Sequence, residues 1–361
     1  MRDMDWAVEQ ELIEAGVAQR ARISARLMGG EWVSGQDVAG SLRVSRAAVN
    51  KHVQLLRARG MDIESVPGSG YLLRSRTDTL IPEVVLPVLL GAGLYPPGSD
   101  CYLGLPYRFE PEVPSTNFVA KQMAQQGVPG GAFMVTEHQT AGRGRLDRVW
   151  LNERGKDLTF SVLLRPELAS GDAGAMVLAA AVAVCEVLSL LPGMAGRVKT
   201  KWPNDLLVDG RKVAGILAEA SMDIDVIYWL VIGIGLNVNG DAGRLVPRET
   251  LAPGQPPPVS LAELTGTPVH RVLLLAHLAR ELSRRWCQVT GGRRAAVIEA
   301  YAESDALLGR HVVVRSGLRR EQLLAEGIAQ GLGPGGELLL HQTDGTVRSV
   351  SSGEATPTYE R

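Results

Sequence analysis

DLLVDGRKVAGILAEA, residues 205–220, is the stretch that decides how the middle of the chain folds. Asp209 and Gly210 stand between two apolar runs, and an Asp-Gly pair in that setting is a strong signal for a two-residue β-hairpin. The two runs are therefore predicted to lie antiparallel in one sheet. Lys212 follows the turn closely, at a place where a lysine is usually solvated.

The segments around this hairpin alternate between strand and helix patterns. The predicted strands cover residues 131–138, 157–165 and 226–239, and the predicted helices cover residues 117–126, 173–191, 269–286 and 294–304. Residues 77–114 are expected to be a Pro- and Gly-rich connector with one short helix, and residues 251–259 a surface loop. Beyond residue 307, glycines punctuate short strands, as in a small β-barrel.

Residues 34–60 fit a helix-turn-helix. In SGQDVAGSLRVSRAAVNKHVQLLRARG, Ser34 is predicted to cap one helix and Ser45 to cap a second. Val49, Val53 and Leu56 share one face of the second helix. Residues that could contact DNA in a major groove are Ser45, Arg46, Asn50, Lys51, Gln54 and Arg57.

A solvated helix of a small helical domain is the alternative for this segment. Against it, residues 43–59 contain five Lys or Arg and no acid, although the whole chain has 38 basic and 39 acidic residues. Gly68 and Gly70 then predict a tight hairpin tip, a wing that would reach the neighbouring DNA backbone. The pattern predicts a winged helix-turn-helix that binds DNA.

The composition allows several domains and excludes some classes of protein. A chain of 361 residues can bury two or three cores. Its 45% hydrophobic and 21% charged residues are typical of a folded globular protein. The three cysteines match no metal-ligand spacing. Because neither a signal core nor a membrane-spanning apolar run is evident, we expect a cytoplasmic protein with no membrane contact.

A basic, glycine-rich stretch, QTAGRGRLDRVW, covers residues 139–150. Its glycines allow backbone N–H groups to approach an anion, and its arginines can bind phosphate or carboxylate with two hydrogen bonds each. Such a loop could bind nucleic acid, bind a small molecule that carries phosphate, or be a solvated turn. The loop alone does not decide among these uses.

Four motifs taken together resemble the biotin protein ligases. They are PSTN at 114–117, EHQTAGRGR at 137–145, KWPNDLLVDGRKVAGILAE at 201–219 and GIGLNVN at 233–239, in order and at similar spacing. SRAAVNKHVQLLRARGMDIESVPGSGY at 45–71 is similar to the DNA-binding head of the bifunctional bacterial members, which also repress biotin genes. The resemblance covers residue 23 to the C-terminus.

This resemblance implies a multidomain α+β protein. Residues 1–75 would form the winged helix-turn-helix, residues 76–305 a mixed-sheet ligase domain of the biotin/lipoate ligase type, and residues 306–361 an SH3-like β-barrel. The family joins biotin to ATP, keeps biotinyl-5′-adenylate bound, and transfers biotin to a lysine of a carrier domain. The implied partners are the biotin carboxyl carrier domain of acetyl-CoA carboxylase, operator DNA, a second copy in a homodimer, and Mg²⁺.

The resemblance also assigns roles to residues. Attack of a carboxylate on phosphorus brings two anions together, so cations are needed where charge gathers. Lys212 and Arg145 are the implied catalytic residues, and Asp205 would help to place Mg²⁺. The implied biotin site comprises Ser115, Thr116, Asn117, Gln139, Gly142, Arg143, Gly144, Arg145, Lys212 and Gly215. The implied nucleotide site comprises Arg143, Arg145, Trp150, Asn204, Lys212 and Asn237.

Several of these residues could instead have purely structural roles. Ser115 and Thr116 could cap the helix that begins near residue 117, in addition to binding a ligand. Trp150 could belong to the core. Asn237 could satisfy the end of a strand.

The chain departs from the family in the loop, where GRGRLD replaces the usual GRGRRG. Leu146 stands for an arginine and Asp147 for a glycine. A carboxylate about 6 Å from the phosphate would cost roughly 3 kcal/mol, so Asp147 is expected to face away or to make the intermediate leakier. A lipoate-type ligase and a non-catalytic biotin-sensing regulator are the alternative functions. The GRGR loop argues against the first, and retention of Lys212 and Arg145 against the second.

Overall fold

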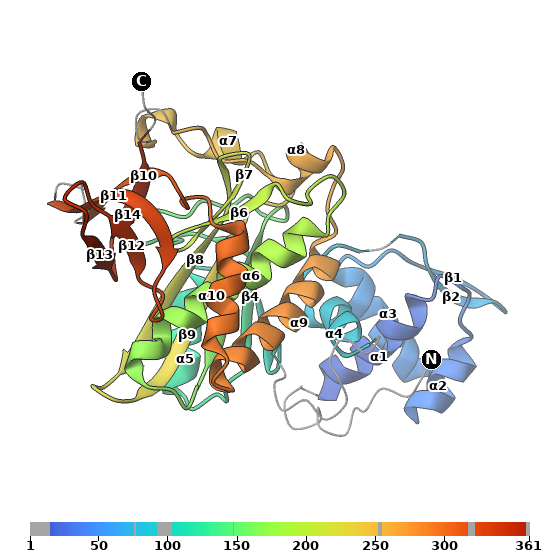
Figure 1. Ribbon diagram of the computed structural model, residues 1–361. Coiled ribbons are helices and arrows are strands. Elements are labelled where there is room, and N and C mark those ends of the chain that lie inside the picture. Colours follow the sequence, from blue (N-terminus) through green and yellow to red (C-terminus); the bar gives the residue numbers. More distant parts are fainter. Residues whose placement is uncertain are drawn as a thin grey trace.

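The computed structural model describes residues 15–75, 77–91, 103–146, 148–251, 255–316 and 322–358. Figure 1 shows three parts in sequence order: a helical head in blue, a central sheet with its helices, and a small all-strand part in red. In the described part of the chain, no helix has both the length and the apolar character needed to cross a bilayer.

The head contains α1 (Ala15–Leu27), α2 (Gly35–Leu42), α3 (Arg46–Ala58) and a two-stranded wing of β1 (Ile63–Val66) and β2 (Gly70–Leu73). Both predicted caps are confirmed, because the Ser34 hydroxyl accepts the N–H of Gln36 and the Ser45 hydroxyl accepts that of Ala48. The shared apolar face of α3 is buried in the core of the head. Residues 1–14 of the segment assigned to the winged helix-turn-helix lie outside the described residues.

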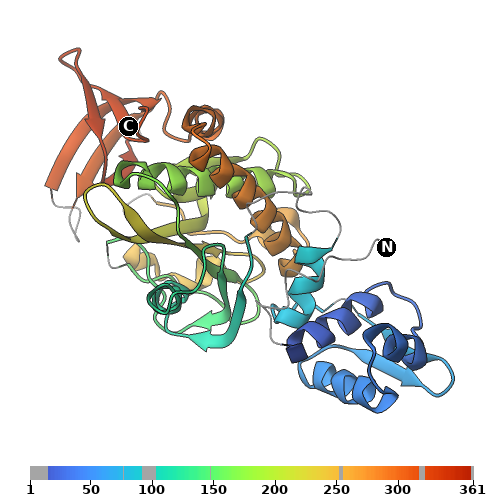
Figure 2. The ribbon, with the colours of Figure 1, turned by 90° about the horizontal axis from the view of Figure 1, so that it is seen from below.

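A short helix, α4 (Pro82–Leu90), joins the head to the central part, and Figure 2 shows it between them. It is the helix predicted within the connector. Its apolar side packs against α1, and its fully buried Glu83 forms ion pairs with Arg20 of α1 and Arg59 at the end of α3. Because a buried carboxylate is tolerated only when it is paired, these contacts fix the head against α4.

The central sheet has seven strands in the order β3-β4-β5-β9-β8-β7-β6. They are β3 (Tyr107–Val113), β4 (Phe133–Gln139), β5 (Leu158–Leu164), β6 (Val198–Lys201), β7 (Asp205–Val208), β8 (Arg211–Met222) and β9 (Ile227–Leu236). β3 and β4 are parallel and the other neighbours are antiparallel, so the sheet is mixed. The predicted hairpin joins β7 to β8, with φ of 49° at Asp209 and 77° at Gly210.

Two strands differ from the sequence prediction. The assignment of residues 77–114 to a connector is wrong over β3. This is an edge strand that carries Pro111 and exposed charged side chains, so its sequence YRFEPEV shows little apolar alternation. β6 is not predicted from the sequence because its four residues are too few to set a pattern.

Helices cover both faces of the sheet. α6 (Ala173–Ser189), α9 (Arg271–Thr290) and α10 (Arg294–Ser304) pack on one face, and α5 (Thr116–Gln125) packs on the other. α6 is apolar nearly all round because it lies between the sheet and its neighbouring helices. Shorter helices α7 (Ala242–Leu245) and α8 (Leu261–Thr265) and turns of 3₁₀-helix at Ser170–Asp172 and Arg248–Thr250 lie in the connections.

The C-terminal part is a five-stranded antiparallel sheet in the order β13-β12-β11-β10-β14. Its strands are β10 (His311–Ser316), β11 (Gln322–Leu332), β12 (Leu338–His341), β13 (Val347–Val350) and β14 (Glu354–Pro357). This confirms the predicted small all-β domain. The Trp202 Nε1 donates to the carbonyl oxygen of Gly336 at 3.1 Å, so the sheet is docked beside the end of β6.

Candidate active site

A cavity opens over β8 and β9, where the arginine-glycine loop (residues 139–150) and the C-terminal sheet meet the central sheet. Together with the open solvent at its mouth it spans about 870 Å³. Among the described residues, every residue implied for the biotin and nucleotide sites lines this cavity except Gly142 and Asn237.

Glycines of β8 and β9 form the floor of the cavity. Gly215 pairs with Gly235 across the two strands. A Cβ atom on Gly235 would overlap the indole of Trp150, and one on Gly233 would overlap the carboxamide of Asn117. The glycines therefore allow these two side chains to lie directly against the sheet.

One region of the wall carries hydroxyl and carboxamide groups. Gln139 Oε1 accepts a hydrogen bond from the N–H of Thr116 at 2.7 Å and another from its hydroxyl at 3.2 Å. Ser161 Oγ on β5 lies 2.7 Å from Thr116 Oγ1 and 2.6 Å from Asn117 Oδ1. These buried groups hold one another in place and offer a ligand both donors and acceptors.

The capping role considered for Ser115 is wrong. α5 begins at Thr116, and within the described chain the Ser115 side chain makes no capping hydrogen bond. Gln139 caps the helix instead, because its Oε1 accepts the N–H of Thr116. Ser115 is buried and lines the cavity.

Lys212 and Asp205 form an ion pair in the cavity wall. Lys212 Nζ lies 2.6 Å from Asp205 Oδ1 and 5.8 Å from the centre of the Trp150 ring, within cation–π range. Burial would raise the pKa of Asp205, but the charges of Lys212, Lys201 and Arg148 outweigh it and hold this pKa below its ordinary value. Asp205 is therefore ionised at neutral pH and fixes the lysine ammonium.

The arginine-glycine loop folds back on itself as a small hairpin. The Gly144 N–H donates to the carbonyl oxygen of Arg148, and the Trp150 N–H donates to that of Gly142. The Arg148 side chain pairs with Glu354 of β14, which also lines the cavity. The C-terminal sheet thus holds the loop from outside.

The guanidinium of Arg145 is poorly solvated. Burial lowers its pKa and the charge of Arg148 adds to the effect, while Asp205 opposes it. An anionic ligand beside Arg145 would therefore be stabilised. Asp147, where the chain departs from the family pattern, lies outside the described residues, and the backbone of the adjacent Leu146 is left-handed with φ of 55°.

Asn237 and Asn204 differ in their relation to the cavity. Asn237 Nδ2 donates to the carbonyl oxygens of Val259 at 3.3 Å and Lys212 at 3.5 Å, so it satisfies backbone at the end of β9 beside the cavity. Asn204 Nδ2 donates to the carbonyl oxygen of Ile216 at 2.9 Å, and Asn204 lines the cavity. These contacts show the structural role considered for Asn237, in which its side chain satisfies the end of a strand.

Carboxylates are few in this cavity. Within the described ranges, no group of three or more His, Cys, Asp or Glu side chains could hold a metal ion. Asp205 is bound to Lys212, and Glu354 is bound to Arg148. A Mg²⁺ ion here would need ligands from a nucleotide's own phosphates.

Sequence reasoning missed several residues of the site, among them Thr159, Lys201 and Glu354 in the cavity wall, and Ser161, which donates a hydrogen bond to the wall residue Thr116. Two of them carried a usable signal. Lys201 opens the KWPND motif, and Ser161 is a hydroxyl residue inside a strand whose residues are all buried. Glu354 carried no signal in the sequence, because it lies 206 residues from its partner Arg148.

The exposed face of α3 carries four of the predicted DNA contacts, Arg46, Asn50, Lys51 and Gln54. Arg57 is engaged within the protein instead. Its Nε donates to the carbonyl oxygen of Ile63 at 2.8 Å, and its Nη2 donates to Ser65 Oγ at 3.0 Å. Because both acceptors belong to β1, Arg57 braces the wing against α3.

Comparison with known proteins agrees with this architecture. The family model described as the biotin/lipoate A/B protein ligase family matches residues 110–237, and a model described as an HTH domain matches residues 20–72. The bifunctional ligase/repressor BirA of Escherichia coli K12 is 32% identical over 334 residues, which are 92% of this chain and 95% of that protein.

Two further relatives cover about two thirds of this chain. The biotin–[acetyl-CoA-carboxylase] ligase of Paracoccus denitrificans is 35% identical over 228 residues, 63% of this chain and 90% of that protein. The solved structure of the biotin protein ligase from Aquifex aeolicus, in complex with biotin and ATP, has a TM-score of 0.56 and 27% identity. It covers 70% of this chain and 98% of its own.

Proposed function

Because the chain belongs to the family of bifunctional biotin protein ligases and repressors, we propose that it joins biotin to ATP and then transfers biotin to a protein lysine. In the first step the biotin carboxylate attacks the α-phosphorus, biotinyl-5′-adenylate forms and pyrophosphate leaves. In the second step the lysine amine attacks the acyl carbon and AMP leaves. The same chain binds operator DNA through its head.

One observation carries this proposal: a group of cations and a set of buried hydroxyl and carboxamide groups line a single cavity. Lys212, Arg143 and Arg145 supply positive charge where a carboxylate and a phosphate must meet. Lys212 is already held by Asp205 and beside Trp150. A preorganised ammonium stabilises developing charge without the cost of reorganising at the moment of reaction.

The biotin head would bind at the polar region of the wall. A ureido ring has both N–H donors and a carbonyl acceptor, and Ser115, Thr116, Asn117 and Gln139 offer matching groups. The glycine floor at Gly215 gives the rest of the ligand a flat apolar surface. We assign the carboxyl end to Lys212 and Arg145, because these cations line the same cavity.

The nucleotide would bind on the side of the loop and β7. Arg143, Arg145 and the backbone of Gly142 and Gly144 would hold the phosphate, while Trp150 and Asn204 line the space beside them. Asn237 would act only from behind this wall, through its hydrogen bond to the carbonyl oxygen of Lys212.

Mg²⁺ fits the site only as an ion shared with the nucleotide. It is usually held by one or two carboxylates together with substrate phosphates, and Asp205 is the ionised carboxylate beside Lys212. When bound, the ion would neutralise phosphate charge, and Asp205 would hold it.

The head would read operator DNA with the exposed side of α3. Arg46 and Asn50 can bind base edges, and Lys51 can neutralise phosphate. Proteins of this architecture commonly bind a palindrome as a dimer, so we propose a homodimer on DNA. We also propose the cytoplasm as its location and the biotin carboxyl carrier domain of acetyl-CoA carboxylase as its acceptor, since one compartment must offer both DNA and carrier.

Intact-mass measurement of a carrier domain tests the proposal. Incubation with this chain, biotin, ATP and Mg²⁺ should add one biotinyl group, and lipoate in place of biotin should add nothing. The Lys212→Ala variant should fold and fail to modify the carrier. An unmodified carrier after incubation with the folded natural chain would overturn the proposed activity.

A further inference from the structure

Asn152 occupies an unusual place beside the central sheet. Its carboxamide is buried, with 6% of the residue exposed. Its Nδ2 donates to the carbonyl oxygen of Glu137 at 3.1 Å, and its Oδ1 accepts the N–H of Gln139 at 3.0 Å. These are two backbone groups on one edge of β4, so the side chain takes the place that a neighbouring strand would fill.

The register of β4 with β5 explains why this place is open. The two strands pair only as far as Thr136, which lies opposite Thr159. The next residues of β4, up to Gln139, continue toward the cavity beyond that pairing. Asn152 satisfies this last part of the strand, where a buried backbone group without a partner would be costly.

The same two hydrogen bonds close the base of the arginine-glycine loop. Gln139 begins the loop and Asn152 follows it two residues after Trp150. Inside the loop, Trp150 bonds to Gly142, and Gly144 bonds to Arg148. Three successive cross-links therefore join the two arms of the loop, and the Asn152 carboxamide makes the one closest to the central sheet.

Asn152 also fixes the residue that shapes the polar region of the cavity. The backbone N–H of Gln139 is bound by Asn152, while the Gln139 side chain accepts two hydrogen bonds from Thr116. A shift of Asn152 would therefore move both the cationic loop and the carboxamide of Gln139.

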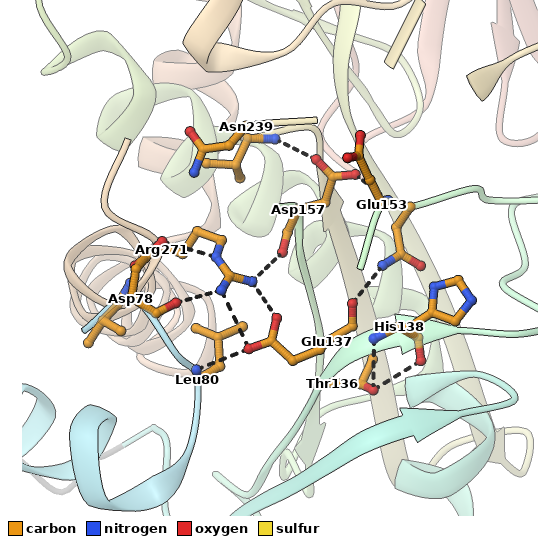
Figure 3. A network of polar contacts seen from close by, with 12 residues as sticks. Asp78, Leu80, Thr136, Glu137, His138, Glu153, Asp157, Asn239 and Arg271 are labelled. Carbon is orange, nitrogen blue, oxygen red and sulfur yellow. Dashed lines mark hydrogen bonds and ion pairs between the residues drawn. The ribbon is translucent and has the colours of Figure 1, made fainter. Parts of the chain in front are cut away.

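The strand to which Asn152 bonds is held rigidly from its other side. The Glu137 carboxylate binds the Arg271 guanidinium at 2.5 Å and accepts the N–H of Leu80 at 3.2 Å, as Figure 3 shows. Arg271, with 3% of its side chain exposed, also donates to the carbonyl oxygen of Asp157 at 3.1 Å. The contacts with Arg271 and Leu80 fix Glu137 against the rest of the domain. Asn152 bonds to the backbone of Glu137, so it ties the loop to a fixed point of the sheet.

We propose that Asn152 is a positioning residue that keeps the arginine-glycine loop closed over the adenylate. It does not line the described cavity wall, so it acts through Gln139 and the loop. The inference rests on the proposed function, and its consequence is specific: loss of the carboxamide should release or hydrolyse the adenylate sooner, since a closed loop excludes water from a mixed anhydride.

The chain contains a matched control in Asn239. Its carboxamide makes the same kind of cross-link, with Nδ2 donating to the carbonyl oxygen of Val269 at 2.9 Å and Oδ1 accepting the Val269 N–H at 2.8 Å. It closes the base of residues 240–268, and none of the described residues in that segment lines the cavity. Asn239→Ala removes an equivalent pair of hydrogen bonds outside the described cavity wall.

Four measurements on the full chain test the proposal in Asn152→Ala and Asn239→Ala. They are the melting temperature, the KM for biotin, the kcat of carrier biotinylation, and the lifetime of preformed adenylate measured by delayed addition of a carrier domain. Both variants should lose thermal stability to a similar degree. Only Asn152→Ala should shorten the adenylate lifetime, by about tenfold, which is the size expected for one to two lost hydrogen bonds. Its KM for biotin should rise and its kcat should change little.

Asn152→Ser provides a graded variant. Its hydroxyl can keep at most one of the two backbone hydrogen bonds and adds no buried charge, so its adenylate lifetime should lie between those of the natural chain and Asn152→Ala. It also decides the question if Asn152→Ala does not fold. An unchanged lifetime in folded Asn152 variants would reduce Asn152 to a structural residue, whereas absence of adenylate in the natural chain would contradict the proposed function itself.

Discussion

The ammonium group of Lys212 lies 2.6 Å from Oδ1 of Asp205, and this ion pair stands in the wall of the cavity directly above a floor of glycines. Asp205 opens β7 and Lys212 is the second residue of β8, so the hairpin turn at residues 209–210 brings the two together. The pair fixes the ammonium group of Lys212 in the site, and Asp205 remains ionised because of its cationic neighbours.

Lys212→Ala should abolish most adenylate formation. Removing one preorganised group that stabilises transition-state charge typically costs about 10²–10³-fold in rate, and pyrophosphate release on mixing biotin with ATP measures this step. Lys212→Arg should recover part of the rate, since it restores the charge in a different shape. Lys199→Ala, a lysine of β6 that is not among the described cavity-lining residues, is the control and should be active.

Glu354→Gln should loosen the arginine-glycine loop without unfolding the protein. The variant frees Arg148 from β14, and a partly exposed ion pair contributes up to about 1 kcal/mol, so adenylate release should accelerate a few-fold. The control is Glu112→Gln, which breaks the exposed ion pair between Glu112 of β3 and Arg154. Equal release rates in the two variants would show that the C-terminal sheet does not hold the loop.

The junction before the C-terminal sheet should make stability depend on pH. Burial raises the pKa of Asp305 from 3.8 to about 6, and its Oδ1 accepts the N–H of Leu307 at 2.8 Å. Between these two values the unfolded chain gives up a proton that the folded chain keeps. The free energy of unfolding should therefore fall as pH rises from about 4 to about 6, and the loss should be complete above that range.

Asp305→Asn should remove this loss, because the amide keeps the acceptor for Leu307 and carries no charge. Its free energy of unfolding at pH 7 should exceed that of the natural chain by up to roughly 3 kcal/mol. Urea denaturation at pH 5 and pH 7 measures the difference. The exposed Asp225→Asn is the control, and an identical pH slope in both variants would contradict the assignment.

The head offers two basic residues with separable roles. Lys51→Ala should weaken binding to any duplex and reduce the slope of log affinity against log salt by about one, as expected for a lost phosphate contact. Arg57→Ala should instead speed amide exchange in β1 and β2, because it removes the two hydrogen bonds that brace the wing. Fluorescence anisotropy over a salt series and hydrogen exchange separate the two effects, and equal results for both variants would refute the distinction.

Much of the fold could be predicted from local sequence. The caps at Ser34 and Ser45, the hairpin at Asp209 and Gly210, and α10 all form as expected. Each depends on residues within a few positions of one another. β3 could not be predicted in this way, because an edge strand exposes one side and shows little apolar alternation.

The residues of the candidate site also fall into two groups, those predictable from local sequence and those placed only by tertiary contacts. Lys212, Arg145 and Gln139 stand in recognisable motifs, so the sequence by itself determined the proposed site residues and the class of chemistry. Only the tertiary structure decided that Asn152 closes the base of the loop and that Glu354 reaches it from the last strand. The physical reason is that local hydrogen bonds and periodicity are set by chain neighbours, whereas these contacts exist only after distant strands have paired and packed.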